Sequence, residues 1–270
     1  MGGAPTPSVR GDSGHASGGA SSRTACRVVR LLEVLAGANT PLRLSELARQ
    51  LDVPVSSTQV LLKELGRCGA VSVTDKREYI RGARLVALGA RLVASLDVVK
   101  LAERRMAELA SEMHEYVYFA LPFADGVMYV SRVGTSSHNL RVEIPLGVAR
   151  PLHATAAGQV YLAFGDAGAL ERLLGSAPLW AETPHTITDV GALRARVQLV
   201  RTRGFAVTEE ESIEGVVGLS APVRSAGGAL AGALTISFFR GRSEFRQEVV
   251  IGRLVDAAKD ISQTLGWDGA

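Results

Sequence analysis

The stretch of sequence that decides the fold is LRLSELARQLDVPVSSTQVLLKELGRCGAV, residues 42–71. It holds two runs at the i, i+3, i+4 and i+7 spacing of an amphipathic helix: Leu44, Leu47, Ala48 and Leu51, then Thr58, Leu61, Leu62 and Leu65. Asp52-Val53-Pro54 joins the two runs, and proline suits the first turn of the helix that follows. Two short helices joined by so tight a connection predict a helix-turn-helix.

The residues on either side extend this motif to a winged helix-turn-helix. Upstream, a third run has the same helical spacing: Val28, Leu31, Leu32 and Leu35. Downstream, Val71 and Val73 alternate with Ser72, and a polar turn over 74–78 leads to Tyr79-Ile80, a pattern typical of a two-stranded hairpin. We therefore predict a winged helix-turn-helix domain over residues 24–82.

Length and composition indicate a globular protein of two domains. A chain of 270 residues with 47% hydrophobic and 21% charged residues lies near the averages of globular proteins, which excludes a wholly disordered or fibrous chain. No apolar run reaches the roughly 18 uncharged residues of a membrane-spanning helix, and the first residues lack the apolar core of a secretory signal. The sequence therefore predicts a cytoplasmic protein with no membrane partner.

Charge is divided unevenly along the chain. Residues 24–92 hold eleven Lys or Arg against six Asp or Glu, a net charge of +5, whereas residues 93–270 hold seventeen against twenty, a net charge of −3. A basic first domain beside an acidic second one indicates a polyanion as the partner of the first domain alone. Modest basicity that serves only solubility is the alternative.

The remaining residues divide into a tail, a linker and a second domain. Residues 1–23, rich in Gly and Ser without a hydrophobic period, predict a disordered tail. Residues 83–113 predict one long or broken linker helix, used for dimerisation or as a plain interdomain connection. In residues 114–270 the expected strands are 116–121, 127–133, 140–144, 205–208, 219–223 and 229–238, and the expected helices are 156–164, 189–201 and 244–265. This order predicts a mainly antiparallel sheet and hence an α+β fold of two domains.

With these elements in place, the chain resembles the IclR family of bacterial transcriptional regulators. In the first domain the matching stretches are residues 42–71, quoted above, and YIRGARLVALG (79–89). In the second domain they are RPLHATAAGQVYLAF (150–164), TPHTITDVGALRARVQLVRTRGFAVTEEE (183–211) and GVVGLSAPVRSAGGALAGALTIS (215–237). The resemblance implies an N-terminal domain that binds double-stranded DNA, a homodimer or dimer of dimers joined through the linker helix, a C-terminal GAF-like domain that binds a small effector, and no cofactor.

The exposed face of the helix after Pro54 supplies the candidates for DNA contact. Together with two cations at the tip of the wing, these candidates are Ser56, Ser57, Gln59, Lys63, Lys76 and Arg77. Gln59 can pair with adenine through two hydrogen bonds, whereas Lys63 suits phosphate. Val55 and Val60 stand where family members commonly carry basic residues, so we expect fewer phosphate contacts and a shallower dependence of affinity on salt.

In the second domain, the resemblance implies an effector pocket formed by a helix start and a late strand. The residues implicated are Ala156, Ala157, Thr208, Glu209, Gly218, Thr235 and Ser237. Small residues at a helix start expose N–H groups that suit a carboxylate, and Thr235 and Ser237 share one face of a strand. Thr208 and Gly218 stand where the family often carries a carboxylate and a cysteine. The effector is therefore expected to be bulkier or less polar than a two- or three-carbon acid.

The residues predict neither a catalytic nor a metal site. The histidines lack the spacing of two to five residues that marks a metal site in a sequence: His15, His114, His138, His153 and His185. Two alternatives to a DNA-binding regulator stay open. One is a winged helix that contacts proteins through Val55 and Val60, and the other is a small-molecule sensor or enzyme that uses the second domain.

Overall fold

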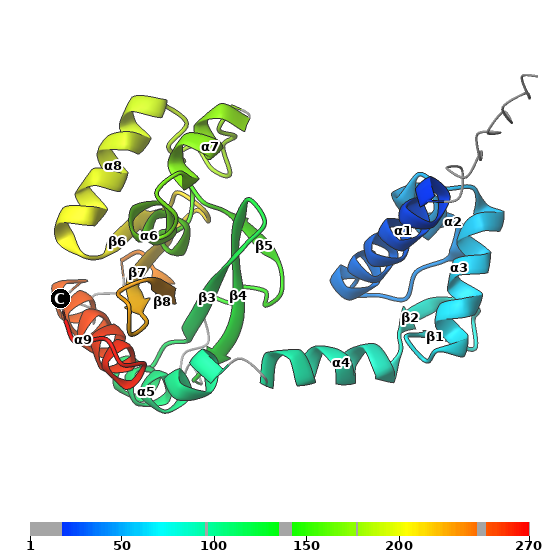
Figure 1. The fold of residues 1–270 in the computed structure, drawn as a ribbon, viewed down its shortest axis with the longest axis horizontal. Helices are drawn as coiled ribbons and strands as arrows, with labels where there is room; N and C mark the ends of the chain where they lie inside the picture. Colours follow the sequence, from blue (N-terminus) through cyan, green and yellow to red (C-terminus); the bar gives the residue numbers. More distant parts are fainter. Residues whose placement is uncertain (1–17, 95–96, 135–141, 177, 242–246, 270) are drawn as a thin grey trace, which may run out of the picture. The chain divides into compact units, whose positions relative to one another are not determined.

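The computed structural model describes residues 18–94, 97–134, 142–176, 178–241 and 247–269. The chain divides into two compact units, residues 1–91 and 92–270 (Figure 1). Residues 1–17 of the predicted tail lie outside the described residues. Residues 18–23, which the sequence places in the tail, lie in the first helix. Because Gly, Ala and Ser supply no apolar stripe, periodicity does not mark this helical turn.

The first unit is a winged helix-turn-helix. Its elements are α1 (Gly18–Gly37), α2 (Leu44–Leu51), α3 (Val55–Arg67), β1 (Val71–Val73) and β2 (Tyr79–Arg81). The two strands pair antiparallel, and Leu42, just before α2, bridges to Tyr79. The helices and the wing share one core, whose buried members are Leu31, Leu35, Leu47, Leu51, Val53, Leu62 and Val71. The helical runs and the hairpin predicted from the sequence are therefore confirmed.

Local hydrogen bonds fix the connection between α2 and α3. Glu46, in the first turn of α2, accepts a hydrogen bond from the backbone N–H of Arg43 at 2.7 Å. Asp52, which ends α2, adopts the left-handed conformation with φ 54°. The hydroxyl of the fully buried Thr58 donates to the carbonyl of Pro54 at 3.2 Å. These contacts fix the start of α3 against the core. The face of the helix that points away from the core is exposed to solvent.

The segment expected as a linker is two helices with different environments. α4 (Ala83–Ala94) carries exposed apolar side chains, with Val86, Leu88 and Leu92 each more than half exposed. α5 (Asp97–Met113) belongs to the second unit and buries six residues against its sheet and α9: Val99, Ala102, Met106, Leu109, Ala110 and Met113. Residues 83–113 thus form a broken helix, one of the two forms expected from the sequence, and their role as a linker stays a prediction.

The second unit is built on a six-stranded antiparallel sheet in the order β5-β4-β3-β8-β7-β6. Its strands are β3 (Val117–Phe123), β4 (Gly126–Val133), β5 (Ala149–Pro151), β6 (Ala206–Glu209), β7 (Val216–Arg224) and β8 (Leu230–Phe239). Four further helices belong to it: α6 (Ala156–Phe164), α7 (Ala169–Ser176), α8 (Val190–Arg203) and α9 (Gln247–Thr264). This arrangement confirms the predicted α+β domain with an antiparallel sheet.

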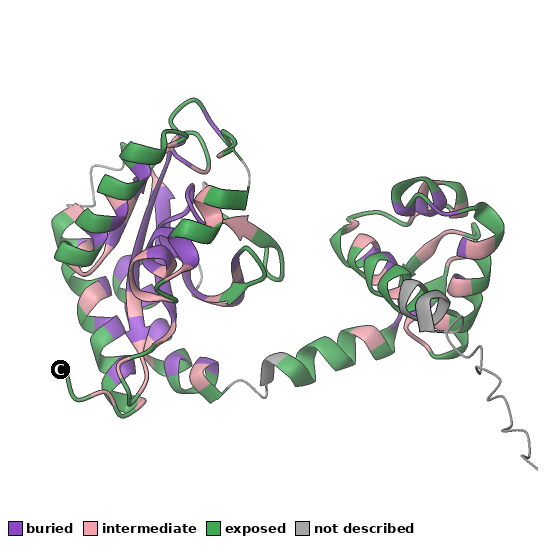
Figure 2. Ribbon diagram, turned by 45° about the horizontal axis from the view of Figure 1, so that its top comes forward, coloured by how far each residue is buried: buried purple, intermediate pink, exposed green. Residues whose placement is uncertain are grey.

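Two cores lie on the opposite faces of this sheet, where the central strands are buried (Figure 2). Val117 and Phe119 of β3 pack with α5 and α9, while Tyr118 and Ala120 point to the face covered by α6 and α8. β7 and β8 alternate in the same way. The face toward α5 and α9 is mostly apolar, whereas the face toward α6 carries small and hydroxyl-bearing residues that line a cavity.

Three elements differ from the expectation: residues 142–144, helix α7 and the short strand β5, which the sequence did not predict. Residues 142–144 are not a strand; residues 140 and 141, the rest of that expected strand, lie outside the described residues. The hydroxyl of Tyr118 donates to the carbonyl of Val142 and accepts from the N–H of Ile144, both at 3.1 Å. The Tyr118 side chain thus makes the hydrogen bonds that a neighbouring strand would otherwise make to the backbone of residues 142–144. Helix α7 was not expected, because its eight residues give too short a periodic run.

Two glycine-to-alanine substitutions are expected to have opposite effects on stability. In α6, a Cβ atom at Gly158 would lie 2.4 Å from the carbonyl oxygen of Leu152, so Gly158→Ala should lower the free energy of unfolding by about 1–3 kcal/mol. In α9, a Cβ atom at Gly252 would meet no atom within 4 Å, so Gly252→Ala should raise it by about 0.5–1 kcal/mol. Guanidinium denaturation measures both, and changes of the same sign would contradict this packing.

Candidate functional site

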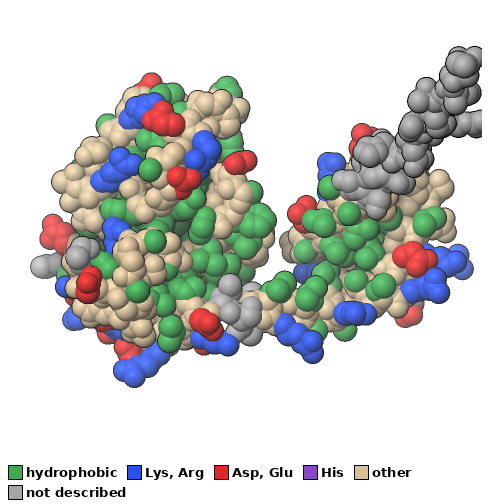
Figure 3. All heavy atoms as spheres, in the orientation of Figure 1, with side chains coloured by type: hydrophobic (Ala, Val, Ile, Leu, Met, Phe, Trp, Pro, Cys, Tyr) green, Lys and Arg blue, Asp and Glu red, His purple; other side chains and the backbone are tan. Residues whose placement is uncertain are grey.

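The face of α3 that points away from the core is accessible. Val55, Ser56, Gln59, Val60 and Lys63 are exposed, and Ser57 is half-buried. Basic side chains lie on the side of the first unit that carries α3 (Figure 3). The structure therefore places the predicted α3 residues on one continuous helix face, together with the two valines that stand in positions where cations were expected.

The basic residues of the first unit fall into two groups. Four are engaged within the unit, in pairs of 3.3–3.5 Å: Arg43 with Glu78, Arg67 with Glu64, Arg81 with the carbonyl of Ala36, and Arg84 with the carbonyl of Cys68. In the described part of the chain, no ion pair involves Lys63, Lys76 or Arg77. Arg49 of α2, which the sequence analysis did not select, is exposed and belongs to this second group. Its signal in the sequence is weak, since basic residues are common in the last turn of a helix.

The tip of the wing holds Arg77 in an unusual conformation. Its N–H donates to the carbonyl of Thr74 at 2.9 Å, and the N–H of Thr74 donates to the carbonyl of Glu78 at 2.8 Å. The φ of Arg77 is +59°, a left-handed conformation that favours glycine and costs a residue with a side chain about 1–2 kcal/mol. The tight turn thus holds the Arg77 side chain at the tip of the wing at a cost in backbone strain.

A cavity of about 30 Å³ lies between α6 and the sheet of the second unit. It is lined by Tyr129, Val142, Ile144, Arg150, Thr155, Ala156, Thr208, Ser212, Ile213, Val216, Gly218, Thr235 and Ser237. Thr208, Gly218 and Ser237 are direct neighbours across β6, β7 and β8. The structure thus brings together five of the seven residues implicated from the sequence, which lie far apart along the chain.

The other two implicated residues lie elsewhere. Ala157 is fully buried in the core beneath α6 and does not line the cavity. Glu209 is exposed and lies 3.9 Å from Arg240. It lines a separate hollow of about 430 Å³ beside α8 and the start of α9, in which Arg196 donates to the carbonyl of Val207 at 3.1 Å. Thr208 and Glu209 point to opposite faces of a strand, so only Thr208 reaches the cavity.

The floor of the cavity depends on the missing side chain of Gly218. A Cβ atom there would lie 2.7 Å from the Oγ1 atom of Thr208 and 3.6 Å from the Cβ atom of Ala156. Thr208 therefore occupies the space that a side chain at residue 218 would need. The two departures from the family pattern noted in the sequence are thus coupled by direct contact.

Hydroxyl groups line the opposite wall. The hydroxyls of Tyr129, Thr235 and Ser237 belong to the lining, and the Oγ atom of Ser220, which lies outside it, is 2.9 Å from the Oγ1 atom of Thr235. Burial raises the pKa of Tyr129 to about 12, so its hydroxyl stays protonated at neutral pH and can donate a hydrogen bond. This wall offers donors and acceptors but no charge.

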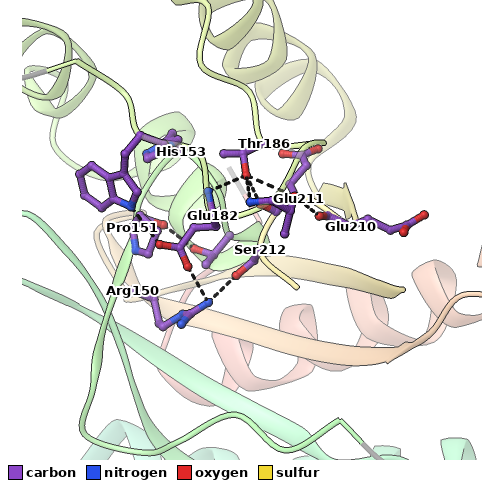
Figure 4. A network of polar contacts seen from close by, with 11 residues as sticks. Arg150, Pro151, His153, Glu182, Thr186, Glu210, Glu211 and Ser212 are labelled. Carbon is purple, nitrogen blue, oxygen red and sulfur yellow. Dashed lines mark hydrogen bonds and ion pairs between the residues drawn. The ribbon is translucent and has the colours of Figure 1, made fainter. Parts of the chain in front are cut away.

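The charge comes from Arg150, which the sequence analysis missed. It is the one charged side chain among the described residues that line the cavity. Its Nη2 atom donates to the Oγ atom of Ser212 at 2.6 Å and lies 3.4 Å from the Oε2 atom of Glu182 (Figure 4). The sequence around Arg150 does not mark it as a ligand-binding residue, because only the fold shows that its side chain faces the cavity.

The loop that follows β6 forms one wall of the cavity and is anchored by polar contacts (Figure 4). Thr183 and Thr186 donate to the carbonyls of Glu210 and Glu211, each at 2.6 Å. The carboxylate of Glu211 pairs with Arg196 and accepts from Gln159 of α6 at 2.8 Å. Burial raises the pKa of Glu211 above its ordinary value, although both partners act to lower it. The base of the loop is therefore held more firmly than Ser212 and Ile213 beyond it.

In the part of the chain that is described, no three His, Cys, Asp or Glu side chains are grouped as a metal ion requires. His153 is fully buried and its Nε2 atom bonds to the carbonyl of Trp180 at 2.8 Å. None of the described helices has both the length and the apolarity needed to cross a bilayer.

A winged helix-turn-helix joined to an α+β domain with a polar-lined cavity defines a DNA-binding regulator with a separate sensory domain. Residues 24–75 match the IclR helix-turn-helix domain, and residues 90–263 match the C-terminal domain of bacterial transcriptional regulators of the IclR type. The chain belongs to the IclR family of bacterial transcriptional regulators.

Individual relatives agree with this assignment. The chain is 31% identical over 204 residues to the probable transcriptional regulator SauR of Cupriavidus necator, covering 75% of this chain and 81% of SauR. It is similar in structure to an IclR transcriptional regulator from Alicyclobacillus acidocaldarius, with a TM-score of 0.80, 25% identity and coverage of 90% and 97%. It also shares the fold of an IclR homologue complexed with 4-hydroxybenzoate from Microbacterium hydrocarbonoxydans, with a TM-score of 0.78, 24% identity and coverage of 89% and 98%.

These matches confirm the resemblance stated from the sequence and the two-domain α+β fold. They also confirm the function class, a transcriptional regulator with a DNA-binding helix-turn-helix domain and a C-terminal effector-binding domain. The relatives named here are regulators, so the alternative of an enzyme is set aside.

The contact between residues 208 and 218 is expected to appear as a coupling energy. Gly218→Ala alone should lower the free energy of unfolding by about 1–3 kcal/mol, because the new methyl group overlaps Thr208. In the double variant Gly218→Ala, Thr208→Ala the overlap is gone, so the loss should be smaller than the sum of the single losses by about 1 kcal/mol. Denaturant titration of the four proteins measures this difference, and strict additivity would contradict the contact.

Arg77→Gly is expected to stabilise the first unit while weakening DNA binding. Relief of the left-handed strain should raise the free energy of unfolding by about 0.5–1 kcal/mol, and loss of a phosphate contact should reduce the salt slope of binding by about 0.9. Lys76→Ala is the matched control, since it removes a wing-tip charge without relieving strain. Unchanged DNA affinity in Arg77→Gly would show that this side chain makes no contact with DNA.

Proposed function

We propose that this regulator occupies a pseudo-palindromic operator as a homodimer or a dimer of dimers, and that a small effector bound in the cavity beneath α6 modulates the occupancy. The observation that carries the proposal is the exposed face of α3, where Gln59 is flanked by Ser56 and Lys63 on a helix held by its own core. A recognition helix of this kind enters the major groove with such side chains toward the base edges.

The exposed polar and basic residues of α3 and of the wing support specific roles in DNA binding. Gln59 reads a base, Ser56 and Ser57 contact bases or phosphate, and Lys63 contacts phosphate. Lys76 and Arg77 reach the adjacent backbone from the wing. Val55 and Val60, 50% and 61% exposed, add no charge, so the salt dependence is shallow for a protein of this class.

Pairing of two copies is supported by α4. Leu85, Leu88 and Leu92 follow the i, i+3, i+7 spacing of a helix-pairing face, and Leu88 and Leu92 are 53% and 60% exposed. A two-fold axis between two such helices matches a palindromic site, since each copy reads one half-site. We therefore assign the linker role to α4 and the DNA-binding role to residues 24–82.

The effector is proposed to be a small organic molecule held by Ala156, Thr208, Gly218, Thr235 and Ser237. These residues line one cavity, and a homologue of the same fold is complexed with 4-hydroxybenzoate, a compact acid. Ala157 and Glu209 are not part of the proposed site. DNA as the partner implies that the protein works in the bacterial cytoplasm, and no cofactor is needed.

A second candidate is a winged helix that contacts proteins, favoured by the exposure of Val55 and Val60 on α3. Capture of fragments of the source genome by the purified protein, followed by sequencing, separates the two. An enriched palindromic site whose affinity falls with salt supports the operator proposal. No enrichment at low salt would favour the protein-contact role.

Gln59→Ala is expected to relax base preference at one position of each half-site. A two-bond contact to adenine contributes about 1–3 kcal/mol of discrimination, so the captured sequences should lose that base while keeping the rest of the site. Lys63→Ala is the control, because loss of a phosphate contact should weaken binding to all sequences alike. An unchanged base preference in Gln59→Ala would overturn the assignment.

A further inference from the structure

We propose that the cavity of the second unit selects an organic anion through Arg150, and that the carboxylate of the ligand replaces Ser212 and Glu182 as the partner of this guanidinium. The inference rests on the proposed effector-binding function and names the class of ligand and the residue that selects it.

The lining of the cavity favours one negative charge on an otherwise compact apolar body. Arg150 is the charged residue of the described lining, while the side chains around it are aliphatic, aromatic or hydroxyl-bearing. A guanidinium group at a cavity lined by aliphatic and hydroxyl-bearing side chains attracts an anion more strongly than it would in water, because these surroundings screen its charge less. Its planar N–H donors also match the two oxygens of a carboxylate.

The present partners of Arg150 can be exchanged at small cost. Its bonds to described residues leave from Nη2 alone, to Ser212 at 2.6 Å and toward Glu182 at 3.4 Å. Glu182 also accepts a hydrogen bond from the Nε1 atom of Trp180 at 2.9 Å, and a quarter of its side chain is exposed. If Arg150 turns to a ligand, Glu182 therefore keeps a partner and gains water.

Because the cavity is small, a ligand can enter it only if one of its walls moves. A volume of about 30 Å³ holds one or two water molecules, so an acid of several carbons requires the lining to move apart. Ser212 and Ile213 have few anchors: Ile213 is 39% exposed and accepts at its carbonyl from the N–H of Val216 at 3.2 Å, and the side chain of Ser212 is bound by Arg150. Glu210 and Glu211, before them, are anchored by Thr183, Thr186 and Arg196.

Arg150 thus has two roles, because it binds the carboxylate of the ligand and, without ligand, holds Ser212 of the loop. When a carboxylate takes the Nη2 donor, Ser212 is released, and residues 212 and 213 can move outward to make room for the ligand, while Gly215 stays bound to Glu210 and Arg240. A neutral ligand of the same shape gains no such bond and leaves the Arg150–Ser212 contact in place. Only a ligand that binds the open arrangement better shifts the loop.

The test compares acids with their own amides on the full-length protein. Calorimetric titration with 4-hydroxybenzoate and 4-hydroxybenzamide, and with benzoate and benzamide, should show each acid binding at least tenfold more tightly than its amide. In Arg150→Gln the acid should lose at least tenfold in affinity and the preference should vanish. In Glu182→Gln, which removes the competing carboxylate, the acid should bind at least threefold more tightly.

Two further variants serve as controls for the comparison of acids with amides. Arg172→Gln is the matched control, because Arg172 of α7 pairs with Asp166, just before that helix, and does not line this cavity. It should bind like the wild type. If Arg150→Gln does not fold, Arg150→Lys keeps the charge and should retain a weakened preference for the acid over its amide.

The outcomes separate this inference from the proposed function. Equal affinity for acids and amides, or a preference that survives Arg150→Gln, overturns the role of Arg150 and leaves effector binding and operator binding standing. Failure of every acid to bind, in a protein that still binds its captured operator, overturns the ligand class and the effector part of the proposed function. If the wild-type protein does not bind the operator, the DNA-binding role is contradicted, whatever the result with the acids.

Discussion

The antiparallel pairing of β7 with β8 is the constraint on which the second unit depends. Because side chains alternate between the two faces of a strand, each residue of this pair points either to the apolar core with α5 and α9 or to the face under α6, which holds the second core and the cavity. Gly218 lies opposite Ser237, and Ser220 lies opposite Thr235. A shift of the register by one residue would place these polar groups in the apolar core and the core residues in the cavity.

How much of this could be predicted from the sequence differs between the two units. The helix-turn-helix was predictable because its core is local, and Leu47, Leu51 and Leu62 repeat at helical spacing within a few turns. The cavity depends on contacts between residues far apart in the chain, and the residues implicated by family resemblance were found there except Ala157 and Glu209. Arg150 was not predictable, since its importance lies in what it faces and not in its neighbours along the chain.

The arginines and acidic residues of the structure also show how one residue type serves different purposes. In the first unit, Arg81 and Arg84 bind backbone carbonyls and stabilise the wing, whereas Arg77 extends from a strained turn. In the second unit, Arg196 and Glu211 hold the loop beside the cavity. Residue type and net charge alone do not separate these roles, because each depends on the backbone group or carboxylate that lies within reach.

The contact of Arg196 with the carbonyl of Val207 has a consequence for how the protein behaves in a crowded solution. β6 is an outer strand of the sheet and only four residues long, and a guanidinium group already occupies one of its outward carbonyls. The opposite outer strand, β5, has three residues and ends in Pro151, which has no N–H to donate. Among the described residues, neither outer strand itself presents a long row of free backbone groups to which a strand of another molecule could pair.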